Sequence, residues 1–256
     1  MRLLRLSREM LLRVVTHGRG VRRVVNGLPV RVDPRARHSF APAYDAPVAA
    51  YLRDHVRQGA EVWNVGANVG VYVLQLAAWV GASGKIVAFE PNPIARRVLR
   101  ANVRLNGLGG QVEIVDSAVG GVVGTVDFFT AGTDGMARGG APNPLLTKTR
   151  RLKVNVTTLD VWAEQRGRIP SWIVMDIEGW EIAALQGGRK VLAACQFAVE
   201  LHPSAWGWSG HSRADLEALI DEFNLEVLPL AGQSDALAEH GQVLLRRRCT
   251  QPLGTL

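Results

Sequence analysis

One stretch constrains the fold of this chain more than any other, because residues 62–90 read as strand, glycine turn, helix, strand and terminal acid. A short apolar run is followed by a helix-length apolar segment at 71–80 and by a second apolar run at 86–89 that ends in Glu90. Short apolar runs bounded by glycines are typical of buried strands. The turn before the helix alternates polar residues and glycines at Asn64, Gly66, Asn68 and Gly70. The stretch therefore predicts a βαβ unit of an α/β fold.

The same residues predict that this unit binds a nucleoside cofactor. Glycines permit a tight turn and a close approach of the backbone to a ligand, and the helix N-terminus adds partial positive charge. An acid at the end of the second strand, here Glu90, can accept hydrogen bonds from two ribose hydroxyls. A nicotinamide cofactor would favour the spacing G-x-G-x-x-G. The spacing from Asn64 to Gly70 instead resembles the S-adenosylmethionine (SAM) loop of class I methyltransferases; the alternatives are a nicotinamide cofactor and a purely structural turn.

Length and composition favour one globular body. The chain has 256 residues, of which 47% are hydrophobic, and we expect an N-terminal extension over 1–44 and the main domain over 45–256. No run of 18 apolar residues predicts a membrane-spanning helix. Arginines interrupt the apolar N-terminus, which is unlike a signal peptide. Cys195 and Cys249 are too few for a disulfide framework, so we expect a reducing, cytoplasmic location.

Positive charge is concentrated at the N-terminus. Residues 1–40 contain ten Arg and two acids, a net charge of +8, so the rest of the chain carries −1 of the formal +7. Residues 2–16 mix arginines with leucines like a basic amphipathic helix, which would dock on the body, bind a partner or lie peripherally on an anionic membrane. Nucleic acid is the weaker alternative, because the body is near neutral and residues 1–39 contain no aromatic side chain. The Asn-Gly pair within 24–32 predicts a hairpin.

The remaining patterns continue the α/β alternation. Amphipathic segments at 46–56, 94–106 and 212–223 predict helices, and residues 122–129 predict a β-hairpin around Gly124. Residues 130–150 are rich in Gly, Pro, Thr and Arg and lack periodicity, which is typical of a lid or a disordered loop. Further runs of strand length occur at 112–116, 154–157, 173–176, 197–203, 225–228 and 242–247.

Polar residues follow several of these strands, where open α/β sheets gather their ligand groups. Asp116 and Ser117 follow the third strand and are expected near adenine. Three acids, Asp176, Glu178 and Glu181, come directly after the fourth strand, and His202 lies near the end of the fifth. Packing alone does not explain three acids after a core strand. The alternatives are that Glu178 and Glu181 stabilise the following helix N-terminus and that His202 is structural.

Taken together, these motifs resemble the FkbM family of SAM-dependent methyltransferases. The residues that carry the resemblance are Asn64 to Gly70, Phe89 to Pro93, Leu105 to Gly107, Ser117 to Gly120, Thr158 to Asp160, Asp176 to Glu181 and Glu200 to Pro203. The resemblance implies a Rossmann-like, seven-stranded, mostly parallel sheet with one antiparallel strand, flanked by helices. It also implies SAM as the cofactor and O-methylation of a small-molecule, sugar or glycolipid acceptor.

The chain departs from the family pattern at three places. The family turn usually begins with Asp, where this chain has Asn64, and the strand before the acidic motif usually carries Lys, where this chain has Val174 and Met175. Asn64 retains hydrogen bonding but not the negative charge. Trp180 replaces a small residue and predicts a narrowed or aromatic acceptor site.

The sequence thus predicts two groups of site residues. The predicted cofactor-binding residues are Asn64, Gly66, Asn68, Gly70, Glu90, Asp116, Ser117 and Asp176. The predicted catalytic residues are Asp176, Glu178 and His202, and the predicted acceptor-binding residues are Trp180, Glu181 and Trp206. Histidine is the usual base near neutral pH. Asp176 and Glu178 could ligate a divalent cation, but the sequence shows no clear third ligand, so no metal is expected.

Two rival functions stay open beside O-methylation of a small acceptor. One is a nucleic-acid methyltransferase or binder that uses the Arg-rich N-terminus, for which a steep salt dependence of binding would speak. The other is a membrane-attached, non-catalytic protein with a SAM fold, for which failure to bind SAM would speak. The sequence predicts no oligomeric state.

Overall fold

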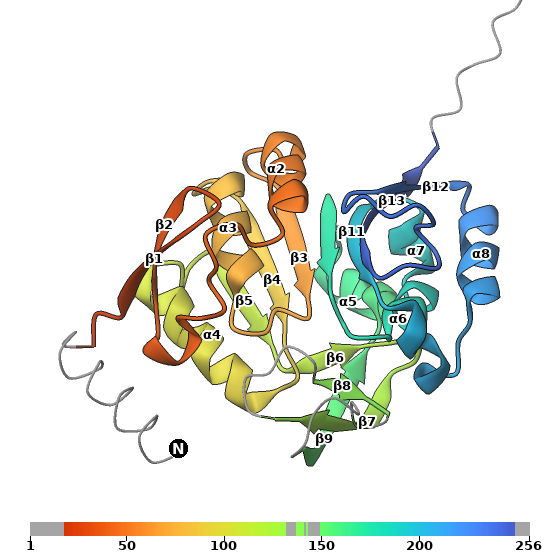
Figure 1. The fold of residues 1–256 in the computed structure, drawn as a ribbon, viewed down its shortest axis with the longest axis horizontal. Coiled ribbons are helices and arrows are strands. Elements are labelled where there is room, and N and C mark those ends of the chain that lie inside the picture. The colour runs from red at the N-terminus through yellow and green to blue at the C-terminus, as the bar shows by residue number, and fades with distance from the viewer. Residues whose placement is uncertain (1–17, 132–136, 141, 143–148, 249–256) are drawn as a thin grey trace, which may run out of the picture.

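The computed structural model describes residues 18–131, 137–140, 142 and 149–248, whose elements are drawn in Figure 1. The predicted amphipathic helix at 2–16 and most of the predicted lid at 130–150 lie outside the described residues. Within the part that is described, no helix is both long and apolar enough to cross a membrane.

A seven-stranded sheet forms the centre of the molecule. Its strands, in spatial order, are β12 (Leu225–Pro229), β13 (Gly241–Arg247), β11 (Gln196–Leu201), β10 (Trp172–Met175), β3 (Glu61–Val65), β4 (Lys85–Phe89) and β5 (Val112–Val115). The strand β13 runs antiparallel to both of its neighbours, and the pairs from β11 through β5 are parallel. The predicted mostly parallel sheet with one antiparallel strand is therefore confirmed.

Helices cover both faces of this sheet, because successive strand residues point to opposite sides. Trp63 and Val65 pack into a core with the first helix layer, whereas Val62 packs into a core with the second. The first layer consists of α5 (Leu159–Arg166), α6 (Glu181–Gln186), α7 (Arg189–Leu192) and α8 (Arg213–Glu222). The second consists of α2 (Ala46–His55), α3 (Val71–Val80) and α4 (Pro93–Leu105). Both faces are buried, so the strands read as apolar runs rather than alternating patterns.

The predicted N-terminal hairpin is present. Its strands β1 (Val21–Val25) and β2 (Leu28–Val32) pair antiparallel around Asn26 and Gly27, whose φ angles of 47° and 81° suit a two-residue hairpin turn. The short helix η1 (Pro34–Ala36) follows. The hairpin and η1 share a core cluster with residues of α3 and α4. The division at residue 44 stays a prediction.

A second, four-stranded sheet replaces the hairpin predicted around Gly124. Its order is β6 (Ser117–Val119), β9 (Arg150–Thr157), β7 (Gly124–Thr130) and β8 (Arg138–Gly139). Gly124 begins β7 instead of forming a turn, because β7 pairs along its whole length with β9. Figure 1 shows this sheet beyond the ends of β3, β4 and β5, below α6. Pairing partners so far apart in sequence leave no local turn signal, so the prediction at 122–129 was wrong.

Candidate active site

The turn after β3 brings the ends of three strands together. Gly66 has φ +84°, and a Cβ atom there would lie 1.9 Å from the backbone oxygen of Asp176. Glycine at this position therefore allows the turn to approach the end of β10. The backbone nitrogens of Gly66 and Ala67 both donate to the oxygen of Phe89, at 3.1 and 2.9 Å. Gly70, with φ +94°, then turns the chain into α3.

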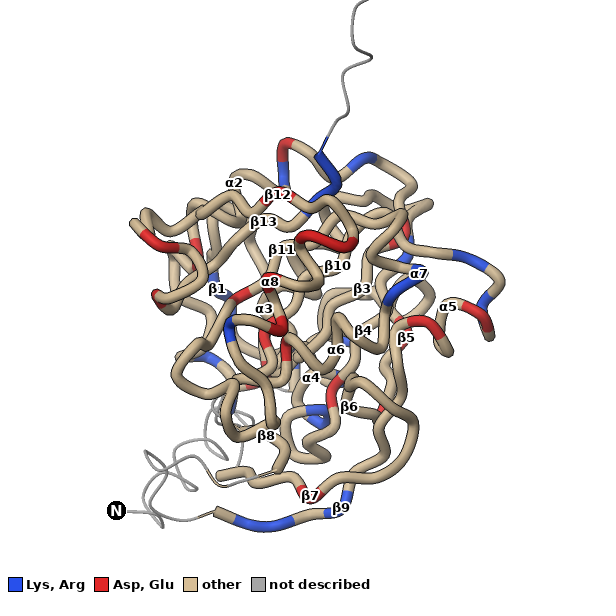
Figure 2. Tube along the Cα trace, turned by 90° about the vertical axis from the view of Figure 1, so that its right-hand side faces the viewer, with Lys and Arg blue, Asp and Glu red and all other residues tan. Residues whose placement is uncertain are grey.

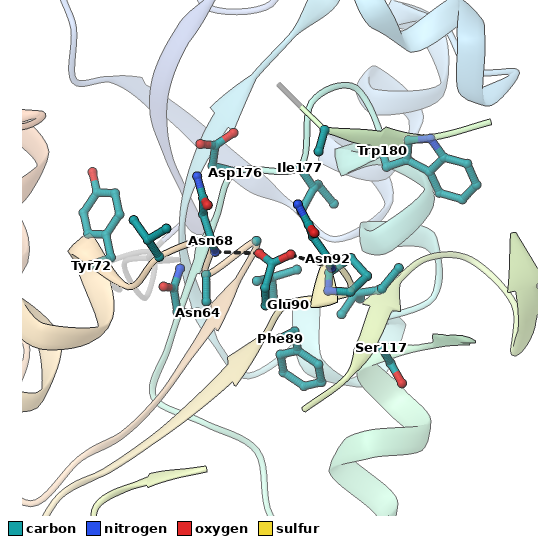
Figure 3. A pocket seen from close by; sticks show the side chains of 18 of the residues that line it. Asn64, Asn68, Tyr72, Phe89, Glu90, Asn92, Ser117, Asp176, Ile177 and Trp180 are labelled. Carbon is teal, nitrogen blue, oxygen red and sulfur yellow. Dashed lines mark hydrogen bonds between the residues drawn. The ribbon is translucent and has the colours of Figure 1, made fainter. Parts of the chain in front are cut away.

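Glu90 is held by this turn. Figure 3 shows its carboxylate between Asn68 and Asn92, whose backbone N–H groups donate to Oε2 at 2.6 Å and to Oε1 at 2.7 Å. The side chain is buried, and burial raises the pKa of Glu90 to about 7 although both hydrogen bonds favour the charged form. Each carboxylate oxygen can accept a second hydrogen bond. Glu90 is thus a fixed acceptor at the end of β4, as the sequence predicts for a ribose anchor.

These residues line a cavity of about 290 Å³ at the carboxyl ends of β3, β4 and β10. Of the predicted site residues, those that line it are Asn64, Gly66, Asn68, Glu90, Ser117, Asp176 and Trp180. In open α/β sheets, ligands bind in this position. The size is near the lower end of the range of ligand pockets.

Unpartnered oxygen atoms show what kind of ligand fits. The side-chain oxygens Oδ1 of Asn64, Asn68 and Asp176 are buried, have no hydrogen-bond partner and belong to residues that line the cavity. The amide nitrogen of Asn64 donates to the backbone oxygen of Val174 at 3.1 Å. Unmet buried acceptors favour a ligand that brings donors or positive charge. SAM brings an ammonium group, a sulfonium and ribose hydroxyls, so the residues present fit it.

Asp116 is not part of this cavity. Its side chain is 65% exposed and faces Arg96, with an N–O distance of 3.9 Å. The neighbouring Ser117, the first residue of β6, does line the cavity. The chain passes from β5 into β6 here, so adjacent side chains point in different directions. Of the two residues predicted near adenine, the structure therefore brings only Ser117 to the site.

The second polar centre lies beside Asp176. Glu181, at the start of α6, is completely buried, and its Oε1 accepts hydrogen bonds from the backbone nitrogen of Gly179 at 2.7 Å and pairs with His202 Nδ1 at 3.0 Å. Its Oε2 accepts the indole N–H of Trp206 at 2.9 Å. Trp206 belongs to η2 (Pro203–Ser209) and is buried too. Neither Glu181 nor Trp206 lines the cavity. The predicted contact of these two residues with an acceptor is therefore not supported at this cavity, because their polar atoms bond within the protein.

His202 points its other nitrogen toward two carboxylates. Nε2 lies 3.9 Å from Asp176 Oδ1 and 3.8 Å from Glu178 Oε2. Burial lowers the pKa of His202, but the hydrogen bond to Glu181 and the charges of Asp176 and Glu178 outweigh burial and raise this pKa to about 9. Burial, with the charge of Glu200, raises the pKa of Asp176 well above its usual value. Neither His202 nor Glu178 lines the cavity, so of these three side chains only Asp176 reaches it.

Three residues that the sequence analysis did not single out complete the cavity. Tyr44 and Tyr72 line one end, and the Tyr72 hydroxyl donates to Asp45 Oδ2 at 3.0 Å. Asn92 holds Glu90 and also donates from its side chain to Thr130 at 2.7 Å. Only Tyr72 carried a usable signal, because it lies in the first turn of the helix that follows the glycine loop. Trp180 lies at the other end, where its indole nitrogen donates to Gly139 of β8 at 3.1 Å.

Comparison with known proteins places this site in a family. The matching family is described as Methyltransferase FkbM domain and covers residues 64–230. A ribosomal protein L11 methyltransferase from Pelotomaculum thermopropionicum is 41% identical over 64 residues, which is 25% of this chain and 20% of that protein. The matched part thus spans only a fifth of that relative.

Several solved structures are similar to this chain. A putative rRNA-methylase from Clostridium thermocellum is similar with a TM-score of 0.50 and 10% identity, covering 78% of this chain and 93% of that one. An O-methyltransferase from Bacillus cereus in complex with SAH gives a TM-score of 0.47 and 14% identity, with 80% of each chain covered. At such identities the likeness concerns the fold alone. The family match covers well over half of the chain and includes every motif from Asn64 to Pro203, so the chain belongs to the FkbM family of SAM-dependent methyltransferases.

Proposed function

We propose that this methyltransferase acts on a hydroxyl group of a small polar acceptor, such as a sugar, a glycolipid or another hydroxylated metabolite. The single observation that supports the proposal is the position of Asp176. It lines the cofactor cavity, its Oδ1 has no partner, and His202 and Glu178 stand directly behind it. A hydroxyl must lose its proton during methyl transfer, and this group of side chains can receive it.

The residues of the first polar centre would hold SAM. Glu90 would accept the ribose hydroxyls, Ser117 would contact the adenine, and the oxygens of Asn64 and Asn68 would face the positively charged end. When bound, SAM supplies an electrophilic methyl group on a sulfonium sulfur. Alignment of donor and acceptor can contribute roughly 7–11 kcal/mol to catalysis.

Asp176 would act at the acceptor. It takes the proton that the hydroxyl loses while the oxygen bonds to the methyl carbon and the sulfur keeps the electron pair of the broken C–S bond. General-base catalysis of this kind contributes about 10²–10⁴ in rate. His202, which its raised pKa keeps protonated near neutral pH, would orient Asp176, and Glu181 with Trp206 would fix the ring of His202.

Charge around the acceptor end argues against a nucleic-acid acceptor. Asp176, Glu178 and Glu200 surround His202, and carboxylates repel phosphates. Figure 2 shows basic segments in several separate places, among them β9, near α7 and near the end of β13. Phosphate tracking needs a continuous basic surface. The acceptors named for the rRNA-methylase and the ribosomal protein L11 methyltransferase belong to those two proteins, and we do not propose them for this chain. A cytoplasmic location fits the buried, unpaired Cys195.

The test is a transfer assay with SAM labelled in its methyl group. An extract is fractionated into glycans, lipids, small metabolites, RNA and protein, and we expect label in one of the first three. Asp176→Asn should lower kcat by about 10²–10⁴ with little change in SAM affinity. Asp116→Asn is the matched control, since this strand-end acid faces outward. Label in RNA or protein, or near-normal turnover of a folded Asp176→Asn, would reject the proposal.

A further inference from the structure

The two ring nitrogens of His202 have different surroundings. Nδ1 pairs at 3.0 Å with Glu181 Oε1, and Glu181 is locked by Gly179 and Trp206. A carboxylate on Nδ1 holds a proton there, so a metal ion that displaces the proton on Nε2 would take the lone pair of that nitrogen. That nitrogen faces Asp176 and Glu178 at 3.9 and 3.8 Å, which is too long for hydrogen bonds. Asp176 Oδ1, Glu178 Oε2 and His202 Nε2 thus lie close together.

Their spacing fits a divalent cation. Asp176, Glu178 and His202 each offer one ligand atom, and these atoms all lie within 4.8 Å of one another. Two of the separations are 3.9 and 3.8 Å and the third is within 4.8 Å, so a point equidistant from the three atoms lies up to about 2.5 Å from each, within the range of metal–oxygen bonds. Asp176 Oδ1 is buried and has no hydrogen-bond partner, so one ligand position is unmet by the protein.

The surroundings match those of metal-binding histidines. A metal-bound histidine usually donates its other N–H to a carboxylate, which fixes the ring and raises its basicity. Glu181 occupies that position. The cluster is also strongly negative, because Asp176, Glu178, Glu181 and Glu200 surround one imidazole. A cation of charge +2 balances this charge better than a single proton on His202.

We propose that Asp176, Glu178 and His202 form a divalent-cation site in the acceptor half of the active site. Two carboxylates with one imidazole suit Mn²⁺, which accepts both oxygen and nitrogen ligands. Asp176 is the one ligand that lines the cavity, so the cation would meet an acceptor on the Asp176 side, and the preferred acceptors would be those that offer a hydroxyl oxygen to it there. Metal coordination lowers the pKa of a bound hydroxyl. This inference rests on the proposed function for its role, but not for its existence.

A neighbouring cluster provides the control. Glu200, His202 and His240 also bring ligand atoms within 4.8 Å of one another. However, His240 Nε2 already pairs with Glu200 Oε1 at 2.8 Å, and the His240 side chain is 61% exposed. The two clusters share only His202, so variants of their other members distinguish them.

The experiment measures Mn²⁺ binding to the full chain by titration calorimetry and by the loss of the electron paramagnetic resonance signal of free Mn²⁺. We expect one Mn²⁺ per chain, at least tenfold weaker binding in Glu178→Gln, and 10- to 100-fold weaker binding in Glu181→Gln through the loss of its hold on His202. His240→Gln should bind Mn²⁺ like the wild type. SAM affinity, measured on each variant, shows that the fold is intact.

Several outcomes would overturn the site. These are no Mn²⁺ binding by the wild type, unchanged binding in Glu178→Gln, or loss of binding in His240→Gln. Methyl transfer to a hydroxyl acceptor that persists at full rate in a chelator would remove the metal's role and leave the proposed function standing. Conversely, Mn²⁺ binding without any hydroxylated acceptor in the labelling assay would support the site and reject the proposed function.

Discussion

At the scale of single residues, Glu90 is the buried carboxylate that we propose as the ribose anchor. Its carboxylate is fixed by the backbone nitrogens of Asn68 and Asn92 before any ligand arrives. Such preorganisation reduces the entropy lost on binding. Burial at the end of the sheet disfavours the charged form of this carboxylate, and the pKa of Glu90 is raised for that reason.

Glu90→Gln should weaken SAM binding by about 10- to 100-fold, because hydrogen bonds to a charged group are worth roughly 1.5–3 kcal/mol. The amide of Gln must also turn a donor toward one of the two backbone N–H groups. Calorimetry with SAM measures the change. Unchanged affinity in a folded variant would exclude Glu90 as the ribose anchor.

SAM affinity should also depend on pH through Glu90. The ionised carboxylate accepts the ribose hydroxyls, and with a pKa of about 7 about a tenth of it is ionised at pH 6. Binding should therefore weaken by about tenfold between pH 8 and pH 6. Glu90→Gln is the control, because the amino group of SAM still titrates there. Equal pH profiles for both proteins would contradict this prediction.

The same pKa shift also affects stability, but whereas SAM binding should strengthen as the pH rises, the contribution of Glu90 to stability falls. The folded pKa of Glu90 lies above the unfolded value of 4.5, so the folded chain binds this proton more tightly. Its contribution to the unfolding free energy is present at low pH and is lost as the pH rises through about 7.

At the scale of elements, the glycine turn after β3 joins the cofactor half of the site to the acceptor half. Gly66 lies against the backbone of Asp176, so the position of this proposed catalytic carboxylate depends on the conformation of the turn. The four-stranded sheet fixes a side chain at the other end of the cavity, because Gly139 of β8 accepts a hydrogen bond from the indole of Trp180.

Gly66→Ala should destabilise the fold by roughly 3 kcal/mol or more, since left-handed strain and a backbone clash act together. Gly107→Ala is the matched control: Gly107 also has positive φ, at +73°, but a Cβ there meets nothing within 4 Å. It should cost only about 1–2 kcal/mol of strain. Denaturant unfolding of both variants measures the difference, and similar losses would show that the contact with Asp176 is unimportant.

At the scale of the whole molecule, charge and chemistry are separated. Residues 1–40 carry the net positive charge, and of those that are described only Ser39 lines the cavity. The hairpin of β1 and β2 belongs to the N-terminal extension and packs on α3 and α4 of the main domain.

Deletion of residues 1–16 should leave SAM affinity unchanged and turnover of a water-soluble acceptor within about twofold of the full chain, because no predicted site residue lies in this segment. The measurements are calorimetry and single-turnover methylation. A folded truncation that binds SAM normally but does not methylate would show that this segment builds the acceptor site.

The sequence by itself determined the parts that depend on local patterns. Glycine spacing, apolar runs and the terminal Glu90 indicated the strand–turn–helix–strand unit, and the ordered motifs implied the seven-stranded sheet with its reversed strand. These features were readable because each is set by neighbours along the chain, through turn conformation and hydrophobic periodicity.

Only the tertiary structure decided which side chains meet. It paired β7 with β9, turned Asp116 outward, buried Glu181 with Trp206, and brought His202 to Asp176 and Glu178 from a different strand. These contacts join residues far apart in sequence, so their geometry follows from how the helix layers and strand ends pack. The third ligand of the proposed cation site became visible for that reason.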